Sequence, residues 1–486
     1  MSIHRNQNLF TLHTKNTSYQ MKVDSKGVLL HTYYGKRMDD TDCSYTIAKF
    51  DRGFSGNIAG TEQERVYSLD YLPQEFPVCG SGDYRVNCLE ADFGHGVSDC
   101  ILFFDHYDIK KGKYSLEGLP AMFAGEEEAQ TLEIVLKDAV EEVYVHLFYG
   151  VLEEKDVITR AAMIENKSTH EVDIKRIMSA CIDFQCAALE LVHFYGKHTG
   201  ERQTEHVTLP HGITEIKSNR GASSHQHNPF VILAEKETTE TNGGCYGFAL
   251  EYSGGFQAQV EVDQFNQVRL VMGIDDSDFL WKLEPGKTFI TPEAAMAYSK
   301  KGFTGLSHIY HKVFHENLIR SVWKNKRRPI LVNNWEATYF DFNEEKLLAI
   351  AKEAAKFDLD MLVLDDGWFG KRESDTSGLG DWYVNEKKLG GTLKDLVEKV
   401  HDMGLSFGLW FEPEMISEDS DLYREHPDWA FRLPGREPVR SRSQLVLDLS
   451  REDVFEYLYE RLSFIIETAH IEYIKWDMNR SISGAY

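Results

Sequence analysis

The sequence has little of what would place it in a membrane or outside the cell. None of its 486 residues belong to an apolar run near the ~20 residues of a membrane-spanning helix. The N-terminus has no apolar stretch leading to a small-residue cleavage site, so nothing indicates secretion. The seven cysteines are odd in number and scattered through the first half of the chain, which favours free thiols. We therefore expect a cytoplasmic protein that does not bind membranes.

Basic residues are also in the minority. Lys and Arg number 53 against 78 Asp and Glu, which gives a formal net charge of -25 at pH 7. This charge repels nucleic acid and anionic surfaces, so neutral or cationic partners are favoured. Apolar residues are plentiful at 42% of the chain, and the length is sufficient for two or three domains with a large core.

Residues 1–300 follow the pattern of an antiparallel β domain. Segments 131–137 and 143–149 alternate apolar and polar residues across a short acidic turn, and later pairs repeat this arrangement up to residue 272. Short strands separated by Gly, Asn and Asp turns predict a sandwich rather than parallel strand–helix–strand units.

The pattern changes after residue 300. Apolar residues recur at helical spacing over 304–323, which predicts a connecting helix within a linker at 301–327. From 328 to 486, strand-like segments (329–335, 360–366, 405–410, 445–448 and 471–476) alternate with helix-like ones (344–357, 393–403 and 452–469), which predicts a parallel α/β domain. A (β/α)8 barrel is the leading interpretation, although only about half of its usual ~250 residues are present.

Polar and aromatic side chains follow the predicted strands of this second domain. Carboxylates, amines and indole rings on one rim suit a sugar, because paired hydrogen bonds hold the hydroxyls while an aromatic face covers the ring. These observations predict a pocket for a polyol. Its candidate residues are, in chain order, Trp335, Asp365, Asp366, Trp410, Lys475, Asp477 and Asn479.

Lys475 and Asp477 lie two residues apart at the end of the last predicted strand, so their side chains share one face. A cation beside a carboxylate keeps the carboxylate ionised, as a nucleophile on a sugar carbon must be. A salt bridge at the surface explains the same two residues without any catalytic role.

Other chemistries find little support. Glu412 and Glu414 flank Pro413 as a second acid pair or a metal site, and we interpret them as positioning groups because no histidine lies at ligand spacing. The histidines between His193 and His227 match no compact ligand motif. Phosphate-binding glycines and a G-x-S-x-G motif are missing, so neither a metal nor another cofactor is expected.

Several motifs, in order along the chain, carry a family resemblance. They are Leu-Asp-Asp-Gly-Trp-Phe at 364–369, Gly-Leu-Trp-Phe-Glu-Pro-Glu-Met at 408–415, His-Pro-Asp-Trp at 426–429, Leu-Val-Leu-Asp-Leu-Ser at 445–450 and Tyr-Ile-Lys-Trp-Asp-Met-Asn-Arg at 473–480, with segments 51–55, 72–77 and 218–225 in the first domain. With these motifs the chain resembles the microbial α-galactosidases of glycoside hydrolase family 36.

The resemblance implies an N-terminal β-supersandwich, a (β/α)8 catalytic barrel and a homo-oligomer, a tetramer in the complete protein. It also implies retaining hydrolysis of terminal α-galactose from oligosaccharides of the melibiose and raffinose type. Asp477 is implied as the nucleophile, and Asp365 and Asp366 as ligands of the galactose 4- and 6-hydroxyls. The other implied contacts are to further hydroxyls, to the pocket wall and to the aglycone: Lys475, Arg442 and Asn479; Trp335 and Trp410; Asp51 and Arg65.

One catalytic part has no counterpart in the sequence. Retaining hydrolysis needs a second carboxyl group ~5–5.5 Å from the nucleophile, and the family places it on a later strand, beyond residue 486. We therefore expect a truncated α-galactosidase that is inactive alone, rather than a short galactoside-binding paralogue, because a barrel cut between strands leaves open edges. Galactosyl transfer and α-N-acetylgalactosaminidase activity are the alternatives within the clan.

Overall fold

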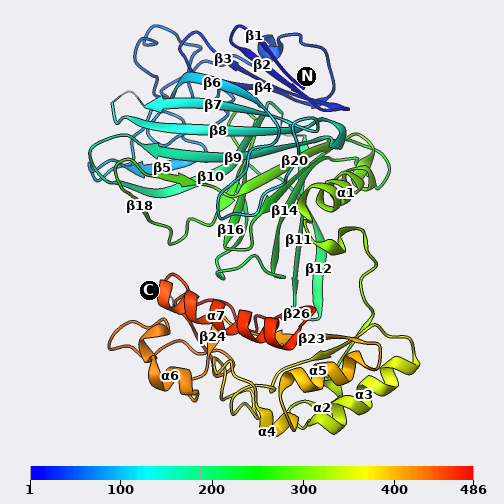
Figure 1. Ribbon diagram of the computed structural model, residues 1–486. Coiled ribbons are helices and arrows are strands. Elements are labelled where there is room, and N and C mark those ends of the chain that lie inside the picture. Colours follow the sequence, from blue (N-terminus) through cyan, green and yellow to red (C-terminus); the bar gives the residue numbers. More distant parts are fainter. Residues whose placement is uncertain (1, 139, 187, 485–486) are drawn as a thin grey trace. The chain divides into compact units, whose positions relative to one another are not determined.

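The computed structural model describes residues 2–138, 140–186 and 188–484 (Figure 1). Contacts between residues divide the chain into two compact units, Met1–Lys324 and Asn325–Tyr486. Within the described ranges, no helix combines the length and apolar character that crossing a membrane requires.

Antiparallel sheets make up most of the first unit. Its N-terminal sheet holds β1 (Ile3–Asn6), β2 (Leu9–His13), β3 (Thr17–Val23) and β4 (Leu29–Lys36) in chain order. A second sheet has the order β13-β16-β17-β10-β18, with β5 also on β10, and a third has the order β12-β11-β14-β15-β20-β9-β8-β7-β6, with β19 on β9. Their bounds are β5 (Leu89–Asp92), β6 (Phe103–Lys111), β7 (Gln130–Asp138), β8 (Val143–Leu152), β9 (Val157–Asn166), β10 (Val172–Phe184), β11 (Leu189–Lys197), β12 (Gly200–Thr208), β13 (Gly212–Ser218), β14 (His227–Glu235), β15 (Cys245–Glu251), β16 (Phe256–Val262), β17 (Val268–Ile274), β18 (Trp281–Leu283), β19 (Thr288–Ile290) and β20 (Glu293–Ser299).

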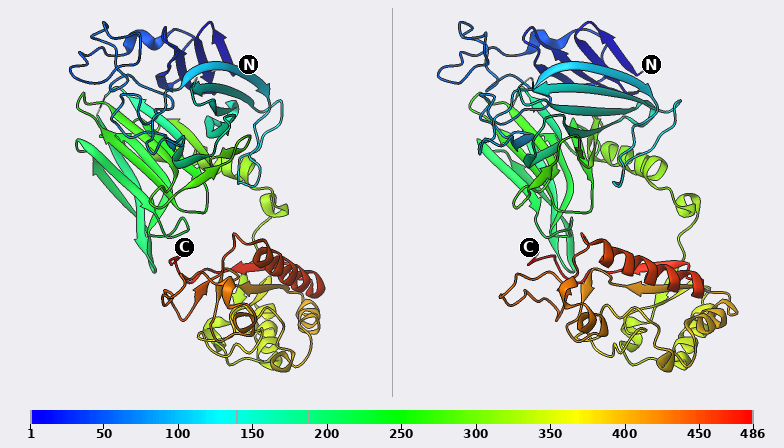
Figure 2. Two further views of the ribbon diagram at one scale, coloured as in Figure 1. Left: turned by 90° about the vertical axis from the view of Figure 1, so that its left-hand side faces the viewer. Right: turned by 60° about the vertical axis from the view of Figure 1, so that its left-hand side comes forward.

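Alternation along the strands explains the core of this unit. On β8, Val143, Val145 and Leu147 are buried, whereas the residues between them are only half-buried, as expected for side chains on opposite faces of a sheet. The buried faces join one apolar core that includes residues of the N-terminal sheet. Figure 2 shows this sheet, in dark blue, packed beside the cyan strands β6 to β8.

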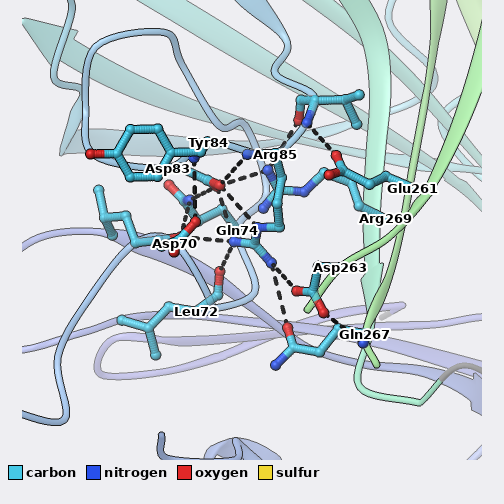
Figure 3. Close-up of polar contacts among 12 residues, drawn as sticks. Asp70, Leu72, Gln74, Asp83, Tyr84, Arg85, Glu261, Asp263, Gln267 and Arg269 are labelled. Atoms are coloured by element: carbon cyan, nitrogen blue, oxygen red, sulfur yellow. Dashed lines mark hydrogen bonds and ion pairs between the residues drawn. The ribbon is translucent and has the colours of Figure 1, made fainter. Parts of the chain in front are cut away.

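The first unit also buries charged groups, several of which form ion pairs. Arg85 Nε donates to Asp83 Oδ1 at 2.9 Å, and Arg269 Nη1 donates to Asp83 Oδ2 at 2.7 Å (Figure 3). Arg85 also lies 3.6 Å from Asp263. Removing one partner would leave an uncompensated buried charge, so we interpret this network as structural.

The helix expected over 304–323 is shorter in the structure. It is α1 (Gly302–Val313), continued by a π-helical turn over Phe314–Leu318. Its apolar face packs on β15 and β20, and Tyr310 Oη donates to the carbonyl of Ala295 at 2.9 Å. This helix is therefore part of the first unit.

Four parallel strands form the sheet of the second unit: β21 (Leu331–Asn333), β22 (Met361–Leu364), β23 (Ser406–Phe411) and β26 (Tyr473–Trp476). Their order in the sheet, β21-β22-β23-β26, follows the chain. The helices between them are α2 (Trp335–Thr338), α3 (Glu344–Lys356), α4 (Glu386–Leu389), α5 (Leu393–His401), α6 (Asp421–Glu425) and α7 (Glu452–Ala469). The connections therefore progress in one direction, as in a singly wound α/β sheet.

Local sequence explains the long helices that the spacing predicted. The Asn343 side chain caps α3 by accepting from the Lys346 amide at 3.0 Å, and Thr392 and Asp395 form a capping box on α5. The predictions for 344–357, 393–403 and 452–469 are confirmed as α3, α5 and α7. The strand predicted at 445–448 is wrong for this sheet: β25 (Leu445–Val446) pairs antiparallel with β24 (Met415–Ile416) instead.

Candidate functional site

The four parallel strands of the second unit end at one edge of the sheet. Asn333 is the last residue of β21, and Asp365, Glu412 and Asp477 directly follow β22, β23 and β26. Because parallel strands run in the same direction, these side chains gather at the carboxyl ends, where α/β sheets bind ligands. We call this set of strand-end residues the rim.

Asp365 connects three of these strands. Its Oδ2 accepts from Lys475 Nζ at 2.7 Å and from Asn333 Nδ2 at 2.6 Å. Its backbone N–H donates to Asn334 Oδ1 at 2.7 Å. The carboxylate is buried, and its charge is compensated by the ammonium of Lys475. Asn333 was not among the residues predicted for the site, although two adjacent asparagines at the end of a strand are a signal for it.

Asp366 is held in a different way from its neighbour. Arg372 donates to both of its oxygens, from Nε at 2.6 Å and from Nη2 at 2.7 Å. Burial raises the pKa of Asp366, while the bidentate Arg372 acts against this rise. The two adjacent aspartates therefore have different partners, and Arg372 is a functional candidate that the sequence analysis missed.

Asp477 receives three hydrogen bonds. Trp410 Nε1 and Asn479 Nδ2 both donate to its Oδ2 at 2.9 Å, and the Met478 amide donates to Oδ1 at 3.1 Å. Its own N–H donates to the Phe411 carbonyl at 2.8 Å, which continues the register of β26 on β23. The carboxylate is thus fixed in orientation while the residue stays partly exposed.

The predicted pairing of Lys475 with Asp477 is wrong. Among the described residues, Lys475 forms its ion pair with Asp365, and the donors to Asp477 are neutral. The two residues share a strand face, but the ammonium at the end of the long Lys475 side chain extends toward β22. An indole N–H and the side-chain amide of Asn479 therefore hold Asp477 where the sequence predicted a neighbouring cation.

Glu412 is linked to Asp477 through Asn479, which contacts both carboxylates. Glu412 is fully buried; its Oε1 accepts from the backbone N–H of Asn479 at 2.5 Å and its Oε2 from Gln444 Nε2 at 3.1 Å. Burial is the main cause that raises the pKa of Glu412; the hydrogen bonds from Asn479 oppose it, and the charge of Asp477 adds to it. These contacts support its interpretation as a positioning group. Glu414 accepts from Trp476 Nε1 at 2.8 Å.

The two tryptophans of the predicted pocket wall differ in exposure. Trp410 is only 1% exposed and packs against Phe369 and Trp382, so its contribution at the rim is the N–H donated to Asp477. Trp335 is half-buried, with Tyr339 and Phe340 packed edge-on at centroid distances of 5.2 and 5.1 Å. Trp335 is therefore the better candidate for an aromatic platform.

Three of the residues predicted for the site take no part in the contacts described above. Arg442 is exposed on the segment before β25 and has a left-handed backbone with φ of 51°. Asp51 and Arg65 belong to the first unit, where Arg65 Nη2 donates to Asp51 Oδ1 at 2.6 Å, and this hydrogen bond lowers the pKa of Asp51. Among the described residues, no rim carboxylate belongs to a cluster of three ligands that could hold a metal. Such a cluster does occur elsewhere in the described ranges, at His4, His13 and Asp40 of the first unit.

Two family models match the chain. The model of the glycosyl hydrolase family 36 N-terminal domain matches residues 27–284, and the melibiase model matches residues 288–486. Together they cover most of the first unit and all of the second, with the rim inside the melibiase match.

Similar curated proteins are α-galactosidases. The bifunctional α-galactosidase/sucrose kinase AgaSK of Mediterraneibacter gnavus is 51% identical over 481 residues, which are 99% of this chain and 51% of that protein. The α-galactosidase AgaA of Geobacillus stearothermophilus is 45% identical over 475 residues, 98% of this chain and 65% of the relative. The chain thus spans between half and two thirds of the length of these relatives.

Solved structures that resemble this chain are also those of α-galactosidases. The galactosidase domain of AgaSK superposes with a TM-score of 0.98 at 50% identity, over 100% of this chain and 68% of that one. A variant of the Geobacillus AgaA in complex with raffinose gives a TM-score of 0.96 at 44% identity, over 98% of this chain and 66% of that one.

Proposed function

The chain belongs to glycosyl hydrolase family 36, and on this basis we propose that it supplies the nucleophile of an α-galactosidase that removes terminal α-galactosyl residues with retention. The observation that carries the proposal is the position and hydrogen bonding of Asp477. Asp477 is a partly exposed carboxylate at the carboxyl end of β26, fixed by Trp410, Asn479 and the Met478 amide. An oriented anion at this edge of an α/β sheet is what attack on an anomeric carbon requires.

The two oxygens of Asp477 are not equivalent. Oδ2 accepts two hydrogen bonds, from Trp410 and Asn479, whereas Oδ1 accepts one, from a backbone amide. We assign attack to Oδ1, which keeps more of its lone-pair density. The bond from Oδ1 to the anomeric carbon forms as the glycosidic C–O bond breaks, and water later releases galactose. We assign no residue of this chain to the second carboxyl group that protonates the leaving oxygen.

The charged groups at the rim suit recognition of galactose hydroxyls. The Asp365–Lys475 pair offers an acceptor and a donor side by side, and Asp366 has further lone pairs beside Arg372. We propose that these residues bind the sugar, with Asn479 and Arg442 at other hydroxyls and Trp335 at the apolar ring face. A polar pair that is already ordered binds hydroxyls at a low entropic cost. Asp51 and Arg65 are proposed to contact the aglycone.

The proposed substrates are galactooligosaccharides of the raffinose and melibiose type. Variants of one relative, the Geobacillus AgaA, carry raffinose and stachyose in their complexes, which supports this substrate class. We further propose that the first unit is a β-supersandwich and that the parallel sheet is the first half of a (β/α)8 barrel, because its strand order follows the chain. All seven cysteines are free thiols and five are buried, which supports the proposal of a cytoplasmic enzyme. We also propose a homo-oligomer, as the family resemblance implies.

Covalent trapping tests the nucleophile directly. A 5-fluoro-α-galactosyl fluoride has an activated leaving group, so it forms the glycosyl-enzyme without help from an acid. We expect one label per chain, located by peptide mass spectrometry on Asp477, and no label on Asp477→Asn. Asn479→Ala, in which Asp477 remains, should be labelled more slowly. A label on Glu412, Asp365 or another carboxylate would overturn the assignment.

A further inference from the structure

A cluster of two imidazoles and a carboxylate lies on the N-terminal sheet, in the first unit. His4 is in β1 and His13 is the last residue of β2 (Figure 1). The register places His4 opposite Thr11, so His13, two residues further, is on the same face. Their rings lie 5.1 Å apart in an edge-on arrangement. The third member, Asp40, comes from the loop after β4.

Asp40 joins the two histidines. Its Oδ2 lies 2.8 Å from His4 Nδ1, and its Oδ1 lies 2.8 Å from His13 Nε2. The potential ligand atoms of the three residues are all within 4.8 Å of one another. A tetrahedral zinc ion with bonds of ~2.0–2.2 Å holds its ligands ~3.3 Å apart, so small side-chain rotations would accommodate it.

A hydrogen bond already holds the His13 ring in one orientation. His13 is buried, and its other ring nitrogen, Nδ1, lies 2.8 Å from the hydroxyl of Ser18. A hydroxyl oxygen accepts as well as donates, so Ser18 can hold the tautomer in which Nδ1 carries the proton and Nε2 has a free lone pair. Histidines that bind metals typically donate their second N–H to such an oxygen.

We propose that His4 Nδ1, His13 Nε2 and the Asp40 carboxylate form a binding site for a divalent transition metal of the zinc class. Two imidazoles and one carboxylate suit Zn²⁺ or Co²⁺ rather than Mg²⁺ or Ca²⁺, which prefer oxygen ligands. The His4 and Asp40 side chains are 42% and 52% exposed, so solvent water has access to complete the coordination. The ion ties β1, β2 and the loop after β4 together, and it serves stability rather than the sugar chemistry of the second unit.

Metal titration tests this site. Chelator-treated protein near neutral pH should bind one equivalent of Zn²⁺ by calorimetry, and Co²⁺ should give the intense visible absorption of a four-coordinate site. His4→Gln and Asp40→Asn should each weaken Zn²⁺ binding by at least about tenfold, because each removes one ligand. The matched control is His106→Gln: His106 is exposed and also lies 2.6 Å from an aspartate, Asp105, but has no second histidine beside it. The His106→Gln variant should bind Zn²⁺ with the same affinity as the wild type.

A stability readout completes the test. Zn²⁺ should raise Tm in the wild type and in His106→Gln, but not in Asp40→Asn, because a ligand that binds only the folded state stabilises it. Asp40 is largely exposed, so we expect Asp40→Asn to fold. This variant therefore tests the proposal even if His4→Gln folds poorly. If Zn²⁺ does not bind at a stoichiometric site, or if the Asp40 and His4 variants bind it unchanged, the cluster is a hydrogen-bonded His–Asp–His group and the proposal is wrong.

Discussion

Lys475 forms an ion pair with Asp365 across an intervening strand. Lys475 Nζ lies 2.7 Å from Asp365 Oδ2, yet β26 and β22 are not neighbours, because β23 lies between them. In the register, Lys475 is opposite Trp410 of β23. The long lysine side chain therefore passes over β23 to a carboxylate that is buried at the end of β22. This contact fixes the spacing of the rim, because it holds residues of three strands in one arrangement.

The first prediction concerns the stability of this pair. Lys475→Met leaves the buried Asp365 without its cation, so we expect the free energy of unfolding to fall by about 1–3 kcal/mol. The estimate is below that for a fully buried pair because Lys475 is 37% exposed. Asp365→Asn in the Lys475→Met background should recover part of the loss. Urea unfolding of both single variants and of the double variant gives the coupling energy, and additivity within ~0.5 kcal/mol would show that the two residues are independent.

The second prediction concerns the nucleophile. With α-galactosyl fluoride, whose leaving group needs no protonation, Asp477→Ala should release fluoride at least about 10³-fold more slowly than the wild type. Added azide should occupy the space of the lost carboxylate and attack from the same face, which yields β-galactosyl azide. Fluoride release is followed with an electrode and the product by NMR. An α-configured azide, or a variant that keeps most of the wild-type rate, would assign the nucleophile elsewhere.

The third prediction concerns pH and a carboxyl group in the first unit. Burial, with a smaller effect from Glu293, raises the pKa of Glu251 to about 8. In the unfolded chain this group titrates near its ordinary value, so between about pH 4.5 and 8 the folded state binds the extra proton. Stability from this group is therefore complete below that window and declines as pH rises through it.

Glu251→Gln should remove this decline, because the amide stays neutral. We expect the variant to gain about 1–3 kcal/mol relative to the wild type at pH 8 and nothing near pH 4. Denaturant unfolding at both pH values measures it, with the exposed Glu284→Gln as the control that should show no such difference. An equal effect of Glu251→Gln at both pH values would mean that the glutamate does not titrate in this range.

Much of this architecture follows from periodicity in the sequence. The strands of the first unit and α3, α5 and α7 have clear apolar repeats, and the carboxylates at the rim directly follow apolar strand segments. Segment 445–448 has the same apolar composition, but only two of its residues form a strand, which pairs with Met415–Ile416 in a separate two-stranded sheet. Composition does not distinguish a strand of such a small separate sheet from a strand of the main sheet.

Side-chain partners were harder to predict than strand positions. The partner of Lys475 is 110 positions away in the sequence, and Arg372 reaches Asp366 from a loop whose course depends on packing. Nor does the alternation of strand faces reveal that Trp410 turns its N–H toward Asp477. Such contacts depend on the register of three strands at once. This register cannot be predicted from a single sequence.

The final prediction isolates this indole N–H. Trp410→Phe keeps an aromatic ring in the buried cluster but removes the donor at 2.9 Å from Asp477 Oδ2. With one of its three hydrogen bonds lost, the carboxylate is less well oriented, so fluoride release from α-galactosyl fluoride should slow by about 10- to 100-fold with a small change in KM. Trp368→Phe is the matched control: Trp368 is equally buried, but its N–H donates to the Trp410 carbonyl at 3.0 Å. If the two variants lose activity equally, the effect comes from packing and not from the hydrogen bond to Asp477.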